Sequence, residues 1–89
     1  MIITCKNVAE KLTAYLHRHI TSEEIAEWAE SAMMDADFED QHFELIRDIV
    51  SHLGVADVRA FGITFEDCED FLSRLGYHVS VRISEAEAA

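Results

Sequence analysis

The sequence predicts a mainly α-helical fold: a small domain of three to four helices with a short C-terminal β-strand. Three observations support this class. Apolar residues recur at helical spacing in four segments, and residues that cap helices stand at the start of three of them. After Gly76 the apolar period changes from helical to two. The chain has 89 residues and no proline, and we expect one domain over residues 1–84.

The four helices are expected at residues 7–19, 21–35, 38–53 and 64–75. Two of the starts carry the sequence of a capping box, in which a threonine is followed three positions later by an acidic residue. These pairs are Thr21 with Glu24 and Thr64 with Asp67. Asn7 is expected to cap the first helix. Short acidic residues around position 35 compete for backbone amides, which predicts the end of the second helix there.

The third helix has the widest apolar face, which predicts that it is the central one. Gly54 follows it and is expected to end it in the left-handed conformation that glycine adopts without a steric penalty. Residues 55–62 then form a short connector, for which we expect about one helical turn closed by Gly62.

The C-terminal strand is expected at residues 77–83, where apolar and polar side chains alternate. A strand needs partners for its backbone amides and carbonyls, and residues 1–5 are the segment of the chain best suited to pair with it. Alternatively, the strand pairs with its copy in a second subunit or with another protein. Residues 85–89 are expected to form a disordered acidic tail.

Acidity is the strongest feature of the composition, because 18 aspartates and glutamates face 7 lysines and arginines, for a net charge of −11. This charge argues against binding to nucleic acid, which needs a basic surface, and against binding to an anionic membrane. No apolar run approaches the roughly 18 residues of a membrane span, and the first residues lack the layout of a secretory signal. We therefore expect a cytoplasmic protein.

Neither a metal site nor a cofactor site is expected. Asp35, Asp37 and Glu39 match the first ligands of a calcium loop, but Asp40 replaces its essential glycine and Ile46 its final glutamate. The five histidines lack the spacing of metal ligands on a helix, and the two cysteines are too far apart in sequence for a zinc motif.

No catalytic residues are predicted either. The sequence contains no glycine-rich phosphate loop and no nucleophile elbow. Cys68 could be imagined as a nucleophile beside His78, but it falls on the apolar stripe of its helix, where a buried thiol is usually inert. The expectation is a protein that is not an enzyme.

The stretch from residue 21 to 48 holds ten carboxylates and one cation, Arg47. On helices, six of these acids form two outward rows with almost no interleaved cation. Like-charge neighbours at this spacing cost a few tenths of a kcal/mol per pair, and surfaces that serve only solubility more often mix both signs. The residues predicted to bind a basic protein partner are Glu23, Glu27, Glu30, Asp40, Glu44 and Asp48.

In size, acidity and helical content the chain resembles bacterial immunity and antitoxin proteins, which cover cationic nuclease surfaces. The resemblance is one of type and carries no residue over. It implies a small non-enzymatic binding module. The alternative hypothesis is a structural module that forms a homodimer through residues 77–83, with no partner at the acidic face. The oligomeric state in sedimentation measurements distinguishes the two.

Overall fold

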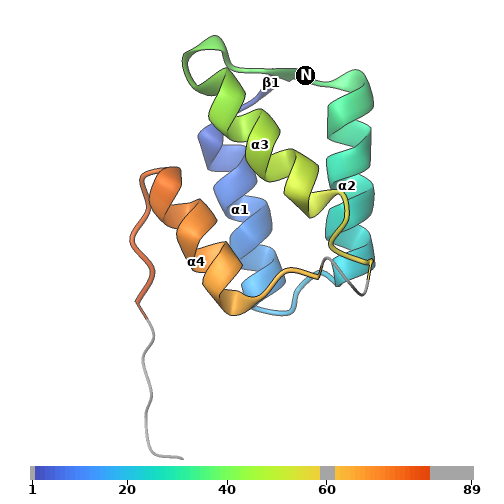
Figure 1. Ribbon diagram of the computed structural model, residues 1–89, viewed down its shortest axis with the longest axis vertical. Helices are drawn as coiled ribbons and strands as arrows, with labels where there is room; N and C mark the ends of the chain where they lie inside the picture. Colours follow the sequence, from blue (N-terminus) through green and yellow to red (C-terminus); the bar gives the residue numbers. More distant parts are fainter. Residues whose placement is uncertain (1, 59–61, 81–89) are drawn as a thin grey trace, which may run out of the picture.

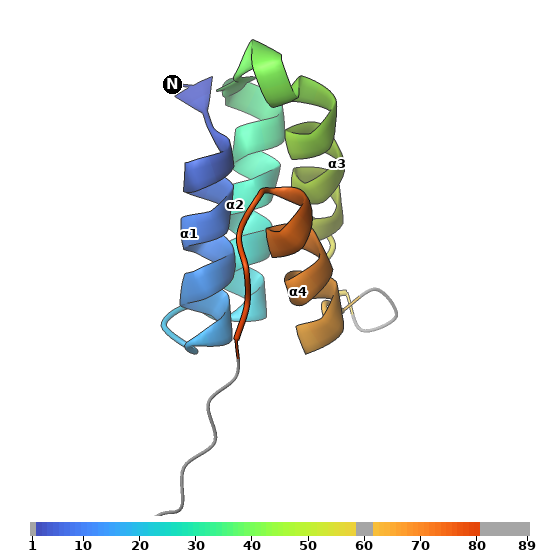
Figure 2. The same ribbon diagram turned by 90° about the vertical axis from the view of Figure 1, so that its left-hand side faces the viewer.

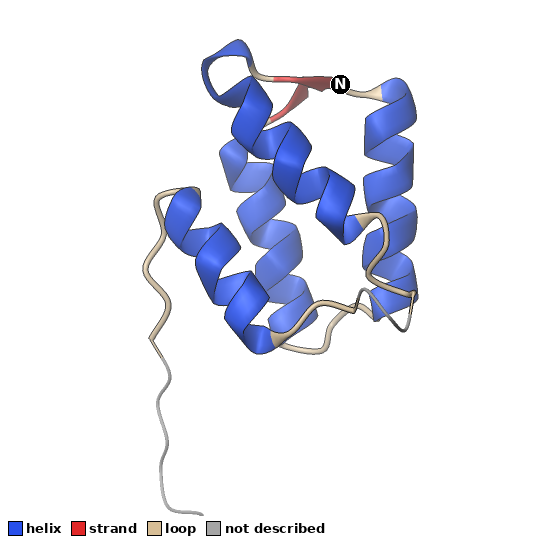
Figure 3. Ribbon diagram, viewed as in Figure 1, coloured by secondary structure: helices blue, strands red, loops and turns tan. Residues whose placement is uncertain are grey.

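The computed structural model describes residues 2–58 and 62–80, and it confirms the mainly α-helical class (Figure 1). Four α-helices lie within these residues, and two very short strands pair at one end of the bundle (Figure 3). In chain order the elements are β1 (Ile2–Ile3), α1 (Cys5–Leu16), α2 (Ser22–Asp35), β2 (Asp37–Phe38), the 3₁₀ helix η1 (Asp40–His42), α3 (Phe43–Leu53) and α4 (Phe65–Arg74).

The helices enclose a single apolar core. α1 contacts the three other helices, α2 and α3 pack side by side, and α4 lies against α1 on the side away from α2 (Figures 1 and 2). All buried side chains among the described residues are apolar. None of the described helices combines the length and the apolar content that crossing a membrane requires. The largest fully buried side chains are Ile3, Leu12, Ile25, Ile46, Ile49, Leu53, Val8, Val50 and Cys68.

Capping boxes start α2 and α4, as the sequence predicts. The Thr21 hydroxyl accepts a hydrogen bond from the Glu24 amide at 3.1 Å, and the Glu24 carboxylate accepts one from the Thr21 amide, also at 3.1 Å. Thr64 and Asp67 repeat this pattern at 3.0 and 3.1 Å. Each box satisfies two backbone amides that a helix start leaves without a partner.

We expect Thr64→Ala to lower the free energy of unfolding by about 1 kcal/mol, because the Asp67 amide loses its acceptor. Chemical denaturation followed by circular dichroism measures the change. The control is Ser73→Ala, an exposed position in the same helix, where the change should stay within about 0.5 kcal/mol. Equal stabilities of the two variants would contradict a contribution from the cap.

The first helix begins earlier than predicted, because Thr4 and not Asn7 is its cap. Thr4 has an extended backbone, and its hydroxyl accepts from the Asn7 amide at 3.2 Å while the Asn7 side chain accepts from the Thr4 amide at 2.9 Å. The strand that ends at Ile3 delivers Thr4 in the extended conformation that a cap requires. The helix also ends earlier, at Leu16 and not at residue 19, and Arg18 adopts a positive φ of 60° just beyond it.

The third helix begins later than predicted, at Phe43 and not at Phe38. Residues 37–38 form β2, which pairs in parallel with β1, so that Ile2 lies opposite Asp37 and Ile3 opposite Phe38. The N-terminal segment is therefore a strand, but its partner lies between α2 and α3 and not at the C-terminus. Burial of Ile3 and Phe38 against the core holds the pair in place.

The expected C-terminal strand is absent from its described part, residues 77–80, which have no regular structure. Gly76 has a φ of +95°, a conformation that favours glycine, and the Tyr77 amide donates to the Leu72 carbonyl at 2.8 Å. This closes α4, and Val79 then packs against the core instead of extending a sheet. Residues 81–83 of the predicted strand and the predicted tail at 85–89 lie outside the described residues.

The connector after α3 begins with turns. Gly54 has φ −62° and ψ −17°, so the prediction that it is left-handed is wrong. The Ala56 amide donates to the Leu53 carbonyl at 3.1 Å, and the Val58 amide to the Val55 carbonyl at 3.0 Å. These tight turns follow α3 without needing the left-handed conformation of glycine.

Candidate functional site

Three of the six predicted partner-binding residues form an acidic row on the outer face of α2. Glu23, Glu27 and Glu30 are exposed and follow i, i+4, i+7 spacing, on the face opposite buried Ile25 and Ala29. No cationic side chain among the described residues lies within ion-pair distance of these three carboxylates. We call this set the α2 row. Its negative charge faces solvent.

An apolar side chain continues the α2 row. Met34 lies four residues beyond Glu30 and is 81% exposed, and its neighbour Met33 is 44% exposed. Methionine has a flexible thioether side chain that adapts to many apolar partners. The last turns of α2 thus present carboxylates and exposed thioethers side by side.

The other three predicted residues lie on other elements, Glu44 and Asp48 on α3 and Asp40 in η1. Asp48 forms an ion pair with Arg74 of α4, with 2.9 Å between its Oδ2 and the guanidinium, so its charge is already compensated. Glu44 is exposed on α3, without an ion-pair partner among the described residues. Asp40 lies in η1, and the prediction that it belongs to the third helix is wrong, because β2 and η1 occupy the residues before Phe43.

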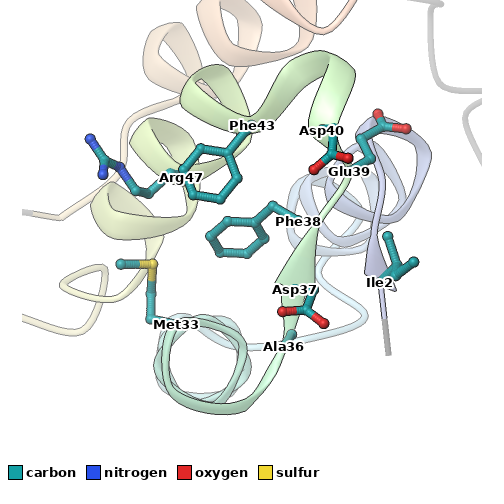
Figure 4. Close-up of a pocket in the computed structure, with 9 residues that line it drawn as sticks. All are labelled: Ile2, Met33, Ala36, Asp37, Phe38, Glu39, Asp40, Phe43 and Arg47. Carbon is teal, nitrogen blue, oxygen red and sulfur yellow. The ribbon is translucent and has the colours of Figure 1, made fainter.

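Asp40 instead edges an open hollow where α2 ends and α3 begins (Figure 4). The hollow measures about 500 Å³, enough for one or two side chains of a partner. Met33 points into it from α2 and Phe43 from α3, with Phe38 between them. The ring centroids of Phe38 and Phe43 are 5.8 Å apart. The lining residues are Ile2, Met33, Ala36, Asp37, Phe38, Glu39, Asp40, Phe43 and Arg47.

The charge around this hollow is predominantly negative. Asp37, Glu39 and Asp40 contribute three carboxylates, whereas Arg47 is the single cation in the lining. The Arg47 guanidinium carbon lies 5.8 Å from the centre of the Phe43 ring, within reach of a cation–π contact. The result is a hollow of mixed polarity, with apolar side chains in its middle, carboxylates on one side and one arginine on the other (Figure 4).

The helical spacing of apolar residues predicts Met33 and Phe38 on buried stripes and Phe43 at the edge of one. Phe38 is buried as expected, but Met33 and Phe43 remain 44% and 43% exposed. In residues 33–43, "MMDADFEDQHF", apolar and acidic residues alternate closely, and this is the only feature of the sequence that points to the hollow. It does not reveal the hollow by itself, because the spacing between α2 and α3 depends on β2.

Cys68 has the properties of an inert thiol, as expected. Its side chain is fully buried, and burial together with the nearby charge of Asp67 raises its pKa to about 11. A thiol with this pKa is protonated at neutral pH and is not an activated nucleophile.

One group of metal-capable side chains comes together in the part of the chain that the structure describes. The ligand atoms of Cys5, Glu39 and His42 all lie within 4.8 Å of one another. The spacing along the chain does not indicate this group, because Cys5 and Glu39 lie 34 positions apart. Burial and the neighbouring Glu39 carboxylate raise the pKa of Cys5 to about 11.

No protein-family model matches this chain, and neither the curated proteins nor the solved structures yielded a match.

Proposed function

We propose that this protein is a small non-enzymatic binding module that engages a basic protein through the α2 row and the adjoining hollow. The partner we infer carries an apolar side chain that enters the hollow and lysine or arginine residues that lie over the carboxylates. In this arrangement the apolar contact supplies affinity, while the charge supplies fast association and rejects acidic competitors.

The observation that carries the proposal is the open hollow, which has both apolar and acidic lining, near the unpaired charge of the α2 row. Large apolar side chains are normally covered when a domain folds, yet Ile2 is 61% and Met34 is 81% exposed at this end of the bundle, beside Met33 and Phe43. Contiguous exposed apolar surface with a polar border is typical of protein-interaction sites. Because the border is mainly acidic, charge complementarity favours a basic partner.

A charge test compares two triple variants with the same change in net charge. Glu23→Lys, Glu27→Lys and Glu30→Lys reverse the α2 row, while Glu66→Lys, Glu69→Lys and Asp70→Lys, the matched control, reverse exposed acids of α4. We expect the wild type and the control to retain a basic protein from host lysate at low salt. The α2 triple variant should lose it, as should the wild type at high salt, where exposed charges are screened.

An apolar test uses two phenylalanines in matching positions. Phe43 and Phe65 are the first residues of α3 and α4 and are 43% and 47% exposed. Phe43→Ala should weaken capture of the same basic protein by about tenfold or more, as expected for an aromatic anchor. Phe65→Ala should leave it unchanged. The proposal would be overturned if both triple variants retained the basic protein equally. It would also be overturned if Phe43→Ala and Phe65→Ala weakened its capture equally.

The second hypothesis, a homodimer through residues 77–83, stays a prediction. Its described part, residues 77–80, provides no strand that would favour this mode of assembly.

A further inference from the structure

The parallel pairing of β1 and β2 brings two distant segments to the same point. Ile3 lies opposite Phe38, and the Glu39 amide donates to the Ile3 carbonyl at 3.0 Å. Both strands therefore end together. Cys5 begins α1 just after β1, and its amide donates to the Glu39 carboxylate at 3.1 Å.

The 3₁₀ helix adds a third side chain to this point. His42 is the last residue of η1, and its amide donates to the Glu39 carbonyl at 3.3 Å. A 3₁₀ helix has three residues per turn, so the side chains of residues i and i+3, here Glu39 and His42, lie on the same side of the turn. The ligand atoms of the thiol, the carboxylate and the imidazole thereby lie within 4.8 Å of one another. Cys5 comes from α1, Glu39 from the junction of β2 and η1, and His42 from η1.

We propose that Cys5, Glu39 and His42 form a three-residue binding site for a divalent cation of the zinc type. Sulfur, imidazole nitrogen and carboxylate oxygen are the ligand atoms that zinc takes in proteins, and three protein ligands leave a fourth position open. Tetrahedral zinc with bonds of about 2.0–2.3 Å holds its ligand atoms about 3.3–3.8 Å apart. The ligand atoms now lie within 4.8 Å of one another, so binding requires the three side chains to move closer together.

The ligand set decides which cation is bound. Calcium and magnesium prefer sites made of oxygen atoms alone, whereas a thiolate and an imidazole select zinc and related transition metals. Cys5 and Glu39 are half-buried and His42 is exposed, so an ion reaches the site from solvent through the side of His42.

The balance of charge is consistent with this ion. Binding replaces the thiol proton of Cys5, which leaves to solvent, so that thiolate and carboxylate together neutralise the two positive charges of the metal. In the free protein the Glu39 carboxylate lies within 4.8 Å of the Cys5 thiol, and its negative charge helps to hold the proton. The N-terminus of α1 favours a negatively charged sulfur, which offsets part of the cost of losing that proton.

Cobalt(II) tests the site, because a cobalt–thiolate bond gives a charge-transfer absorption band in the near ultraviolet. We expect the reduced chain to show this band with an end point of one ion per chain. Zinc added afterwards should displace the cobalt and abolish the band. Cys5→Ser should remove the band, and His42→Asn and Glu39→Gln should each weaken cobalt binding by about tenfold or more. Circular dichroism checks that each variant is folded.

Two controls separate this site from other metal-capable side chains. Cys68→Ala removes the other thiol, and the double variant His17→Asn/His19→Asn removes a neighbouring pair of imidazoles whose ring centroids are 5.6 Å apart. Both controls should retain the band and its end point. Absence of the band in the folded wild type would overturn the proposal. Persistence of the band in folded Cys5→Ser would also overturn it. The same holds if stoichiometric cobalt binding is lost only in the His17→Asn/His19→Asn variant.

Discussion

Ile49→Ala is expected to destabilise the protein by about 3–4 kcal/mol, the usual cost of truncating a fully buried isoleucine and leaving a cavity. Ile49 has no exposed surface and lies in the middle of the buried stripe of α3, with Ile46 and Leu53 one turn to either side. Because a domain of this size has a total stability of about 5–10 kcal/mol, the change removes a large part of it. The melting temperature should fall by about 12–30 °C.

The matched control for this prediction is Met34→Ala. It truncates a side chain of similar size that is 81% exposed, so its effect on the melting temperature should be small. Thermal denaturation of the three proteins by circular dichroism measures both effects. A shift of less than about 5 °C for Ile49→Ala would contradict the position of α3 at the centre of the core.

Alkaline pH is expected to destabilise the folded chain through Cys68. Its thiol has a pKa of about 11 in the folded protein, against an ordinary value of 9.0. The folded state therefore retains a proton that the unfolded state loses. The stabilisation from the neutral buried thiol is complete below pH 9 and is lost as the pH rises through about 11.

The comparison that isolates this effect is wild type against Cys68→Ala, in denaturant unfolding under reducing conditions. Cys5, the tyrosines and the lysines are common to both proteins, so their titration cancels. Relative to the variant, the unfolding equilibrium constant of the wild type should rise roughly fiftyfold between pH 8 and pH 11. Parallel pH profiles for the two proteins would show that the Cys68 thiol ionises as readily when folded as when unfolded.

Local interactions explain why much of the fold was predictable. The boxes of Thr21 with Glu24 and Thr64 with Asp67 each form within four consecutive residues, and both are present as predicted. The outward direction of Glu23, Glu27 and Glu30 follows from helical spacing alone, once the apolar stripe of α2 is known. For these features the sequence within one or two helical turns contains all the necessary information.

The errors occur where a distant segment competes with a local preference. Residues from Phe38 onward have the apolar spacing of a helix, but pairing with Ile2–Ile3 draws Asp37–Phe38 into a strand and delays α3 to Phe43. The same pairing moves the cap of α1 to Thr4. A strand is stabilised by its pairing partner. Whether a segment forms a strand therefore depends on which other segment it meets, and not only on its own amino-acid sequence.

The sequence by itself therefore determined the helical class, the net charge of −11 and the acidic row of α2. Only the tertiary structure decided that Arg74 neutralises Asp48, that Met33 and Phe43 border one hollow, and that Cys5 meets Glu39 and His42. The physical reason is the separation along the sequence of the residues that interact. Caps and helix faces form between residues three or four apart, whereas ion pairs across helices, hollows and clusters of ligand atoms require segments that only packing of the core brings together.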